Sequence, residues 1–287
     1  MKEKIVFFGA GPYVSRTVEV LNKKLEVYVF TTETSRNDPL LLYCIHSNIP
    51  HFSINKFDQK IIRDIKKIGA KIAVLASFGL IVPNDVLDLF DLGIINIHPS
   101  LLPKFRGPTP VQAAILNGDS ITGVTIIKLD EEVDHGPILA QIEEKIQPND
   151  TSETLYKRMF ERGAELLLKV LPKYIAGELK PAEQDHSKAT LTDRLTRQSG
   201  FIDLGQQPTA NNQQLDRMIR TYYPWPGVWF RYQCEPSQRE GSLLNGKIIK
   251  LFPEQKIQVE GKNIMRLSDF ANGYPEGRQI LEKLSLF

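Results

Sequence analysis

Short apolar runs alternate with helical patterns through residues 4–146, and this alternation constrains the fold more than any other feature of the sequence. Asp58–Ile68 places isoleucines at helical spacing opposite lysines, which indicates an amphipathic helix. Helices are also predicted from Gly11 to about Asn22 and over Pro39–Ser47. The predicted strands are Lys4–Phe8, Val27–Thr31, Lys71–Ala76, the run containing Ile94, Ile95 and Ile97, Gly123–Leu129 and Pro137–Ile146. This order predicts an α/β fold with a mostly parallel sheet covered on both faces.

The first strand leads into Gly9-Ala10-Gly11, the opening of a Rossmann-like strand–turn–helix unit. A dinucleotide fingerprint needs a third glycine, but Val14 occupies that place. A tight strand-to-helix turn is therefore a better interpretation than an NAD site. In open sheets of this kind, ligands bind beyond the carboxyl ends of the strands.

Polar side chains with catalytic chemistry gather at one such strand end. Asn96 and His98 alternate out of the isoleucine run onto one face. Pro99 and Pro103 prevent regular structure beyond it, so the strand opens into a fixed, extended loop. Asp134 lies on a later turn that could bring a carboxylate to His98. An amide, an imidazole and a carboxylate are what acyl transfer needs, although His98 and Asp134 could also form a satisfied core pair.

The motif Asn96-x-His98, followed by Ser100-Leu101-Leu102-Pro103 and by Asp134, resembles that of enzymes that formylate amines with 10-formyltetrahydrofolate. Arg106–Gln112 and Thr122–Thr125 look more like the methionyl-tRNA formyltransferases of this family than the glycinamide ribonucleotide formyltransferases. The resemblance implies the formyltransferase fold, 10-formyltetrahydrofolate as co-substrate and initiator methionyl-tRNA as partner. Its runner-up is a formyltransferase for a nucleotide-linked amino sugar, and a non-catalytic RNA- or nucleotide-binding relative is a third possibility.

The resemblance also assigns roles to residues. Asn96, His98 and Asp134 would be catalytic, with Asp134 orienting His98 and favouring its charged form. The family carries a longer basic loop where this chain has only Thr32–Asp38, with Arg36 as its one cation. The turn Ser77–Pro83 would cradle the pterin ring, and the folate contacts would be Gly79, Leu80, Ile81, Val82, Leu129 and Asp134. The expected contacts to the amine substrate are Tyr13, Arg36, Ser100, Leu101, Leu102 and Pro103.

Near residue 190 the alternation of strands and helices gives way to one helix and several short β segments. This change predicts a catalytic domain over 1–189 and a second domain over 190–287. A capping box at Asp150–Glu153 predicts a helix to about Ala176, and Gly177–Ala189 then reads as a linker. Tyr222–Gly227 resembles the start of the C-terminal domain of methionyl-tRNA formyltransferases. The remaining predicted elements are a helix over Asn211–Tyr222 and strands over Val228–Tyr232, Lys247–Phe252 and Lys256–Val259, forming a reduced OB-like β-barrel. We expect Trp225 and Trp229 to pack between the barrel and a helix, and base stacking is the alternative.

Composition narrows the class of protein further. The 287 residues are 41% hydrophobic and 24% charged, as in soluble globular proteins. The net charge of +2 gives no overall signal for nucleic acid, but Ser187–Phe287 holds 14 Lys/Arg against 10 Asp/Glu, an excess of +4. Cys44 and Cys234 match no metal spacing. No run approaches a membrane span and no signal peptide is recognised, so we expect a cytoplasmic monomer without a metal.

Overall fold

The computed structural model describes residues 2–33, 35, 37–204, 212–234 and 242–286. The chain forms two compact units. The first unit contains residues 1–110, 121–145 and 156–192, and the second contains 111–120, 146–155 and 193–287. Because the second unit takes two inserts from within the predicted catalytic domain, the division is not a single cut at residue 189.

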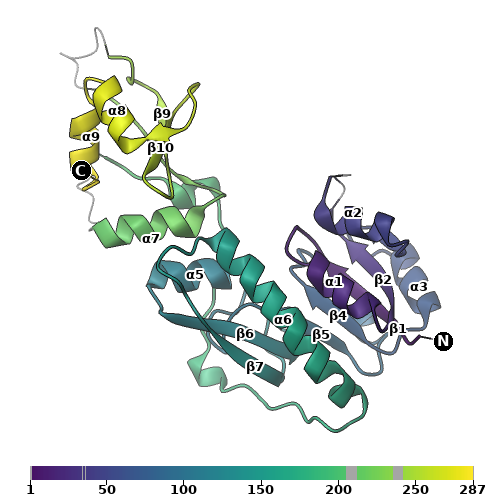
Figure 1. Cartoon of the computed structure of the whole chain (residues 1–287). Helices are drawn as coiled ribbons and strands as arrows, with labels where there is room; N and C mark the ends of the chain where they lie inside the picture. Colours follow the sequence, from purple (N-terminus) through teal and green to yellow (C-terminus); the bar gives the residue numbers. More distant parts are fainter. Residues whose placement is uncertain (1, 34, 36, 205–211, 235–241, 287) are drawn as a thin grey trace. The chain divides into compact units, whose positions relative to one another are not determined.

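The first unit is built on a seven-stranded sheet with the order β3-β2-β1-β4-β5-β6-β7 (Figure 1). Strands β1 to β5 are parallel, and β6 is antiparallel to both of its neighbours. The mostly parallel α/β sheet is therefore confirmed. Its strands are β1 (Lys4–Gly9), β2 (Glu26–Thr31), β3 (His51–Ser53), β4 (Ala73–Ala76), β5 (Ile94–His98), β6 (Ile121–Lys128) and β7 (Ile138–Lys145), of which the short β3 was not predicted.

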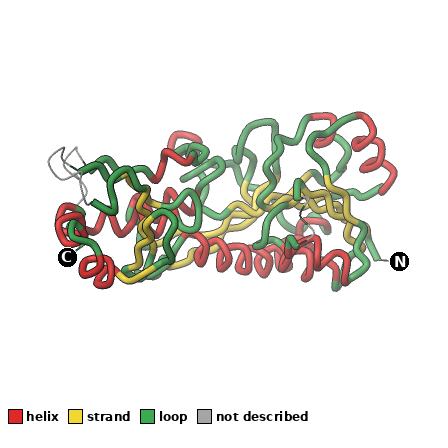
Figure 2. Tube along the Cα trace, turned by 90° about the horizontal axis from the view of Figure 1, so that it is seen from above, coloured by secondary structure: helices red, strands yellow, loops and turns green. Residues whose placement is uncertain are grey.

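Helices lie on both sides of these strands (Figure 2). At α3 (Gln59–Ile68), the Asp58 carboxylate accepts hydrogen bonds from two backbone N–H groups, and Gly69 ends the helix in the left-handed region at φ 70°. The buried face of α3 carries Ile65 and Ile68, as its periodicity predicts. The other helices of the first unit up to residue 110 are α1 (Ser15–Asn22), α2 (Pro39–His46) and α4 (Asn84–Leu87), whereas α5 (Pro110–Asn117) belongs to the second unit from Val111 onward.

The long helix α6 (Ser152–Ile175) confirms the predicted helix but begins with a different capping box. Thr151 and Thr154 exchange hydrogen bonds, each hydroxyl accepting from the other residue's backbone N–H at 3.0 and 3.2 Å. The predicted Asp150–Glu153 box was therefore one residue too early. Further along, a Cβ on Gly163 would lie 2.4 Å from Ile97 Cγ2 of β5, so only glycine allows the helix to approach the sheet this closely.

The second unit contains a four-stranded antiparallel sheet with the order β11-β10-β9-β8. Its strands are β8 (Val228–Arg231), β9 (Ile248–Phe252), β10 (Lys256–Val259) and β11 (Met265–Arg266), and its helices are α7 (Asn212–Tyr222), α8 (Leu267–Gly273) and α9 (Gly277–Lys283). The predicted α7 and three of the strands are confirmed, whereas α8 and α9 were not predicted. Among the described residues the strands form an open sheet, and closure into an OB-like barrel is not seen.

The two tryptophans of this unit behave differently. Trp229 packs against Phe201 with ring centroids 4.8 Å apart, and its indole N–H donates to the Arg197 carbonyl. Trp225 is 58% exposed, so the prediction that it packs inside the domain was wrong. It lies between Pro224 and Pro226, which carry no backbone N–H and prevent regular helix or strand structure at this turn.

The predicted linker is part of the first unit. Ala182 and Ile138 exchange two backbone hydrogen bonds of 2.7 and 2.8 Å, which joins the segment to the edge strand β7. The segment also contains the short 3₁₀ turn His186–Lys188. No helix among the described residues is long and apolar enough to cross a membrane.

Candidate active site

Strand β5 carries the two polar side chains that begin the site. Asn96 and His98 lie near the carboxyl end of this central strand and are only 5% and 3% exposed. Buried polar groups need hydrogen-bond partners, because an unpaired one costs about 1–3 kcal/mol. Both side chains find that partner in Asp134; the sequence predicts the contact with His98, and the contact with Asn96 was not predicted.

Asp134 is the centre of the constellation. Its Oδ1 accepts a hydrogen bond from Asn96 Nδ2 at 3.0 Å and lies 3.4 Å from His98 Nδ1. Its Oδ2 accepts from the backbone N–H of Gly107 at 2.8 Å. Asp134 has a φ of 50°, an uncommon conformation for a residue with a side chain. Three donors thus converge on one carboxylate.

His98 is fixed at both ring nitrogens. Its Nε2 donates to the Phe105 carbonyl at 2.9 Å, while Nδ1 faces Asp134. Burial by itself would lower the pKa of His98, but the Asp134 charge, the hydrogen bond to it and the Phe105 carbonyl outweigh burial and raise this pKa. Burial likewise favours protonated Asp134, but the His98 charge and the bonds from His98 and Gly107 lower the pKa of Asp134. The geometry therefore stabilises an imidazolium beside a carboxylate.

The loop after β5 is held from inside. Ser100 is fully buried and donates from Oγ to the Lys104 carbonyl at 2.6 Å. Leu102, 3% exposed, donates its backbone N–H to Thr125 Oγ1 and accepts from Gln141 Nε2 at its carbonyl. Of the four residues predicted to contact the amine substrate here, only Leu101 and Pro103 keep partly exposed side chains. Ser100 and Leu102 instead determine the shape of the loop.

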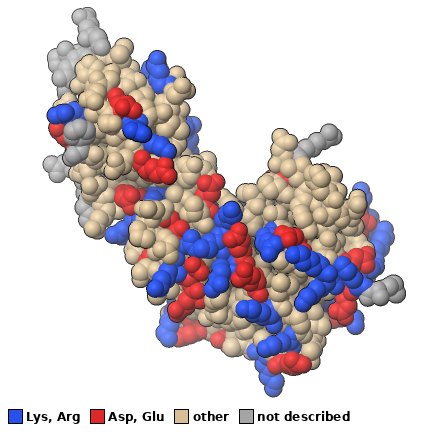
Figure 3. Space-filling view, viewed as in Figure 1, with Lys and Arg blue, Asp and Glu red and all other residues tan. Residues whose placement is uncertain are grey.

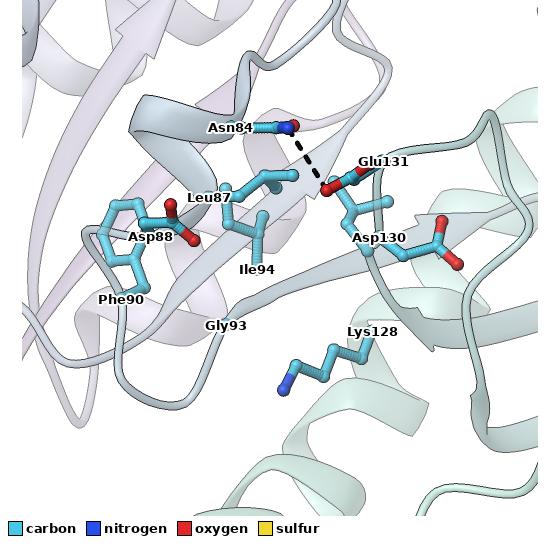
Figure 4. Close-up of a pocket in the computed structure, with 10 residues that line it drawn as sticks. Asn84, Leu87, Asp88, Phe90, Gly93, Ile94, Lys128, Asp130 and Glu131 are labelled. Carbon is cyan, nitrogen blue, oxygen red and sulfur yellow. Dashed lines mark hydrogen bonds between the residues drawn. The ribbon is translucent and has the colours of Figure 1, made fainter.

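A pocket of about 390 Å³ opens beside β5 (Figure 4). Leu129, a predicted folate contact, forms part of its apolar wall together with Leu87, Phe90 and Ile94. Asn84 of α4 donates to Glu131 at 3.2 Å, which joins the two sides of the rim. The remaining lining residues are Asp88, Gly93, Lys128 and Asp130. The sequence did not single out these residues, apart from Leu129, because Leu87, Phe90 and Ile94 cannot be told from ordinary core positions.

The predicted pterin turn lies between β4 and α4. Leu80 and Val82 are half-buried in the same hydrophobic cluster as Phe90, Ile94 and Leu129. Ile81 is 79% exposed, and a Cβ on Gly79 would meet open space. The structure therefore brings Leu80, Val82 and Leu129 together and leaves room above Gly79, but none of Gly79–Val82 lines the pocket itself.

The other predicted substrate contacts are placed as follows. Tyr13 is half-buried with its ring stacked on Tyr156, the centroids 6.0 Å apart and the planes inclined by 9°. Arg36 lies outside the described residues. In the part of the chain that the structure describes, no group of three His, Cys, Asp or Glu side chains could hold a metal ion.

A family model described as formyl transferase matches residues 11–171. The chain belongs to the formyl transferase family. Methionyl-tRNA formyltransferase from Chloroflexus aurantiacus is 42% identical over 244 residues, which cover 81% of this chain and 77% of that protein.

Among solved structures, a 4-N formyltransferase from Francisella tularensis matches with a TM-score of 0.69 and 19% identity, over 88% of this chain and 97% of that one. HypX from Aquifex aeolicus, solved in complex with tetrahydrofolic acid, matches with a TM-score of 0.64 and 17% identity. That match covers 88% of this chain and 38% of HypX. At such identities the two structures establish a shared formyl transferase fold.

Proposed function

We propose that this protein transfers the formyl group of 10-formyltetrahydrofolate to the α-amine of methionyl-tRNA. The observation that carries the proposal is the convergence of Asn96 and His98 on Asp134 at a strand end of a formyl transferase fold. The 42% identity to a methionyl-tRNA formyltransferase supports this amine over other acceptors.

In the proposed reaction the neutral amine attacks the formyl carbon, so that an N–C bond forms and a tetrahedral oxyanion develops. Asn96 Nδ2 has two N–H groups, and Asp134 takes one of them, which leaves the other to donate to the oxyanion. The His98 imidazolium stabilises the same charge. Each donor at comparable sites contributes about 2.7–4 kcal/mol to the transition state.

Collapse of the intermediate breaks the bond between the formyl carbon and N10 of the folate. The amine loses a proton and N10 gains one, and the products are the formamide and tetrahydrofolate. Asp134 and His98 relay this proton through water, since the pair holds a proton and an acceptor side by side. His98 shares its Nδ1 proton more easily than its Nε2 proton, because the contact to Asp134 at 3.4 Å is longer than the 2.9 Å bond to Phe105.

The folate is proposed to lie along the pocket beside β5 and the turn Gly79–Val82. Leu87, Phe90, Ile94 and Leu129 offer apolar surface to the flat pterin ring, and Asp88, Asp130 and Glu131 offer acceptors for its N–H groups. The exposed Ile81 would then be covered by the ligand.

The second unit is proposed to be a reduced OB-like module that binds the tRNA. The cation excess of the segment Ser187–Phe287, with 14 Lys/Arg against 10 Asp/Glu, supports this role, because phosphate contacts supply much of the affinity of proteins for nucleic acids. On the face shown in Figure 3, the Lys and Arg side chains of this unit are interspersed with carboxylates. A broad, salt-sensitive contact therefore suits this surface better than one concentrated basic site.

The deciding experiment supplies 10-formyltetrahydrofolate with either methionyl initiator tRNA or a panel of nucleotide-linked amino sugars, and measures formylated product. We expect formylmethionyl-tRNA. Formylation of an amino sugar instead would favour the alternative suggested by the short segment Thr32–Asp38. Binding of folate and RNA without turnover of any amine would identify a non-catalytic relative.

A further inference from the structure

The loop that carries Asp134 is held by a side chain from the predicted linker. Gln184 is 5% exposed, and its Nε2 lies within hydrogen-bond distance of three successive backbone carbonyls. These belong to Asp134 at 2.9 Å, His135 at 2.9 Å and Gly136 at 2.7 Å. An amide NH₂ has two hydrogens, so the three carbonyls share both of them. Every donor of this side chain is thus committed to the Asp134 loop.

The amide oxygen of Gln184 also has hydrogen-bond partners. Its Oε1 accepts from Arg106 Nε at 3.2 Å and Arg106 Nη2 at 2.8 Å. Arg106 is itself 6% exposed, and its Nη2 also contacts His186 Nδ1 at 2.8 Å. The His186 ring stacks on that of His135, with centroids 4.0 Å apart and planes inclined by 3°. Gln184 and Arg106 therefore belong to one hydrogen-bonded network, in which both N–H groups of the Gln184 amide have acceptors.

Arg106 occupies the position between the two backbone groups that support the catalytic residues. The preceding residue, Phe105, accepts from His98 Nε2, and the following residue, Gly107, donates to Asp134 Oδ2. The backbone of Arg106 is in turn fixed by Thr190 and Thr192, through two hydrogen bonds of 2.8 Å. One Arg–Gln contact thus joins the loop that supports His98 to the loop that presents Asp134.

We propose that Gln184 and Arg106 are positioning residues that hold the Asp134 carboxylate in register with Asn96 and His98. They do not touch the reacting atoms and act through the backbone on either side. Asp134 needs such a support because its φ of 50° is unfavourable for a residue with a side chain. The kinetic part of this proposal rests on the proposed formyl transfer. Misplacement of a reacting group by about 1 Å costs about 100-fold in rate.

The test compares the full-length protein with Gln184→Met, which has similar length and charge but neither donor nor acceptor. We expect kcat to fall about 30- to 100-fold while KM for folate and tRNA changes less than about twofold. We also expect the pKa of His98, followed by NMR of labelled histidines, to fall toward its ordinary value. The control is Gln258→Met, whose amide donates to the Lys262 carbonyl in the second unit.

A second variant guards against simple misfolding. Gln184→Glu keeps an acceptor for Arg106 but has no donor for the three carbonyls, and we expect a similar loss of kcat. If the substitution only lowered the stability of the fold, fewer molecules would be active. The kcat of each active molecule, and its dependence on pH, would then be unchanged. Wild-type kcat in Gln184→Glu, or a wild-type His98 titration in Gln184→Met, would overturn the proposal. If the wild-type protein fails to formylate methionyl-tRNA, the proposed function is wrong, while the His98 titration still decides the role of Gln184.

Discussion

Replacing Asp134 by asparagine tests the catalytic constellation most directly, because Asp134→Asn keeps the shape of the side chain. The carboxylate accepts from Asn96 Nδ2 and Gly107 N–H at 3.0 and 2.8 Å and faces His98 Nδ1 at 3.4 Å. An amide offers one acceptor oxygen and one NH₂ donor. If the oxygen faces Asn96 and His98, the NH₂ opposes the Gly107 N–H. If it faces Gly107, the NH₂ opposes Asn96. Either orientation brings two donors together.

The magnitude follows from these contacts. One buried donor without an acceptor costs about 1–3 kcal/mol, so we expect the free energy of unfolding to fall by that amount. Without the neighbouring charge, only the Phe105 carbonyl still opposes the effect of burial, so the pKa of His98 falls and the imidazolium becomes less populated. The oxyanion then loses the neighbouring positive charge of His98, and we expect kcat to fall about 100- to 1,000-fold.

The pKa shifts of His98 and Asp134 determine how their contribution to the free energy of unfolding changes with pH. The pKa of His98 is raised above 6.5, so its pairing stabilises fully below about pH 6.5 and fades as the pH rises through the folded pKa. The pKa of Asp134 is lowered below 3.8, so its contribution is present above about pH 3.8 and fades as the pH falls through the folded pKa. The destabilisation by Asp134→Asn should therefore be largest between these limits and shrink toward alkaline pH.

The assay is urea unfolding at several pH values combined with single-turnover formylation. The control is Asp58→Asn, which replaces a carboxylate that accepts two backbone N–H groups at the start of α3, far from any reacting group in the sequence. Asparagine caps helices well, so this control should stay within about 0.5 kcal/mol of wild type and keep full turnover. A kcat for Asp134→Asn within about tenfold of wild type would refute the assigned roles of Asp134 and His98.

Three further outcomes are expected. Gly136→Ala should destabilise the protein by about 2–3 kcal/mol in thermal unfolding, since the added Cβ would lie 1.9 Å from the Lys128 carbonyl oxygen; wild-type stability would contradict the packing. Ile81→Asp should weaken folate binding about tenfold in a titration without changing the melting temperature, whereas Ile264→Asp, at another exposed isoleucine, in the second unit, should bind normally. Lys250→Gln on β9 should flatten the salt dependence of tRNA binding by about one log–log unit if this face contacts phosphate, and an unchanged slope would place the tRNA elsewhere.

The sequence predicted those parts of the site that follow from local pattern. Alternation along β5 places Asn96 and His98 together, and two prolines make the following loop irregular. The turn that holds Asp134 made its contact with His98 only a possibility, and the resemblance to a family selected it, since nothing local shows that residues 38 positions apart meet. Strands of the second unit were predicted for the same local reason. Whether they close into a barrel depends on register between distant strands, which no local pattern determines.

The structure also shows why a polar segment was mistaken for a linker. Residues 177–189 contain few apolar side chains, and such composition usually indicates exposure to solvent. Here Gln184 is polar because it is buried against backbone carbonyls that need donors. A tight loop with successive carbonyls on one side cannot satisfy them itself. The residue that does so is 48–50 positions away and is visible only in the folded chain.

This arrangement separates the presence of catalytic residues from their alignment. Asn96, His98 and Asp134 can be recognised by motif, but the carboxylate is in place because Gly107, Arg106 and Gln184 fix its loop from two sides. A chain that kept these three proposed catalytic residues and lost the donor at position 184 is expected to retain the motif and lose the alignment. On the proposed role of Gln184, the motif names the reacting groups, and the buried amide at 184 supplies the hydrogen bonds that fix the Asp134 loop.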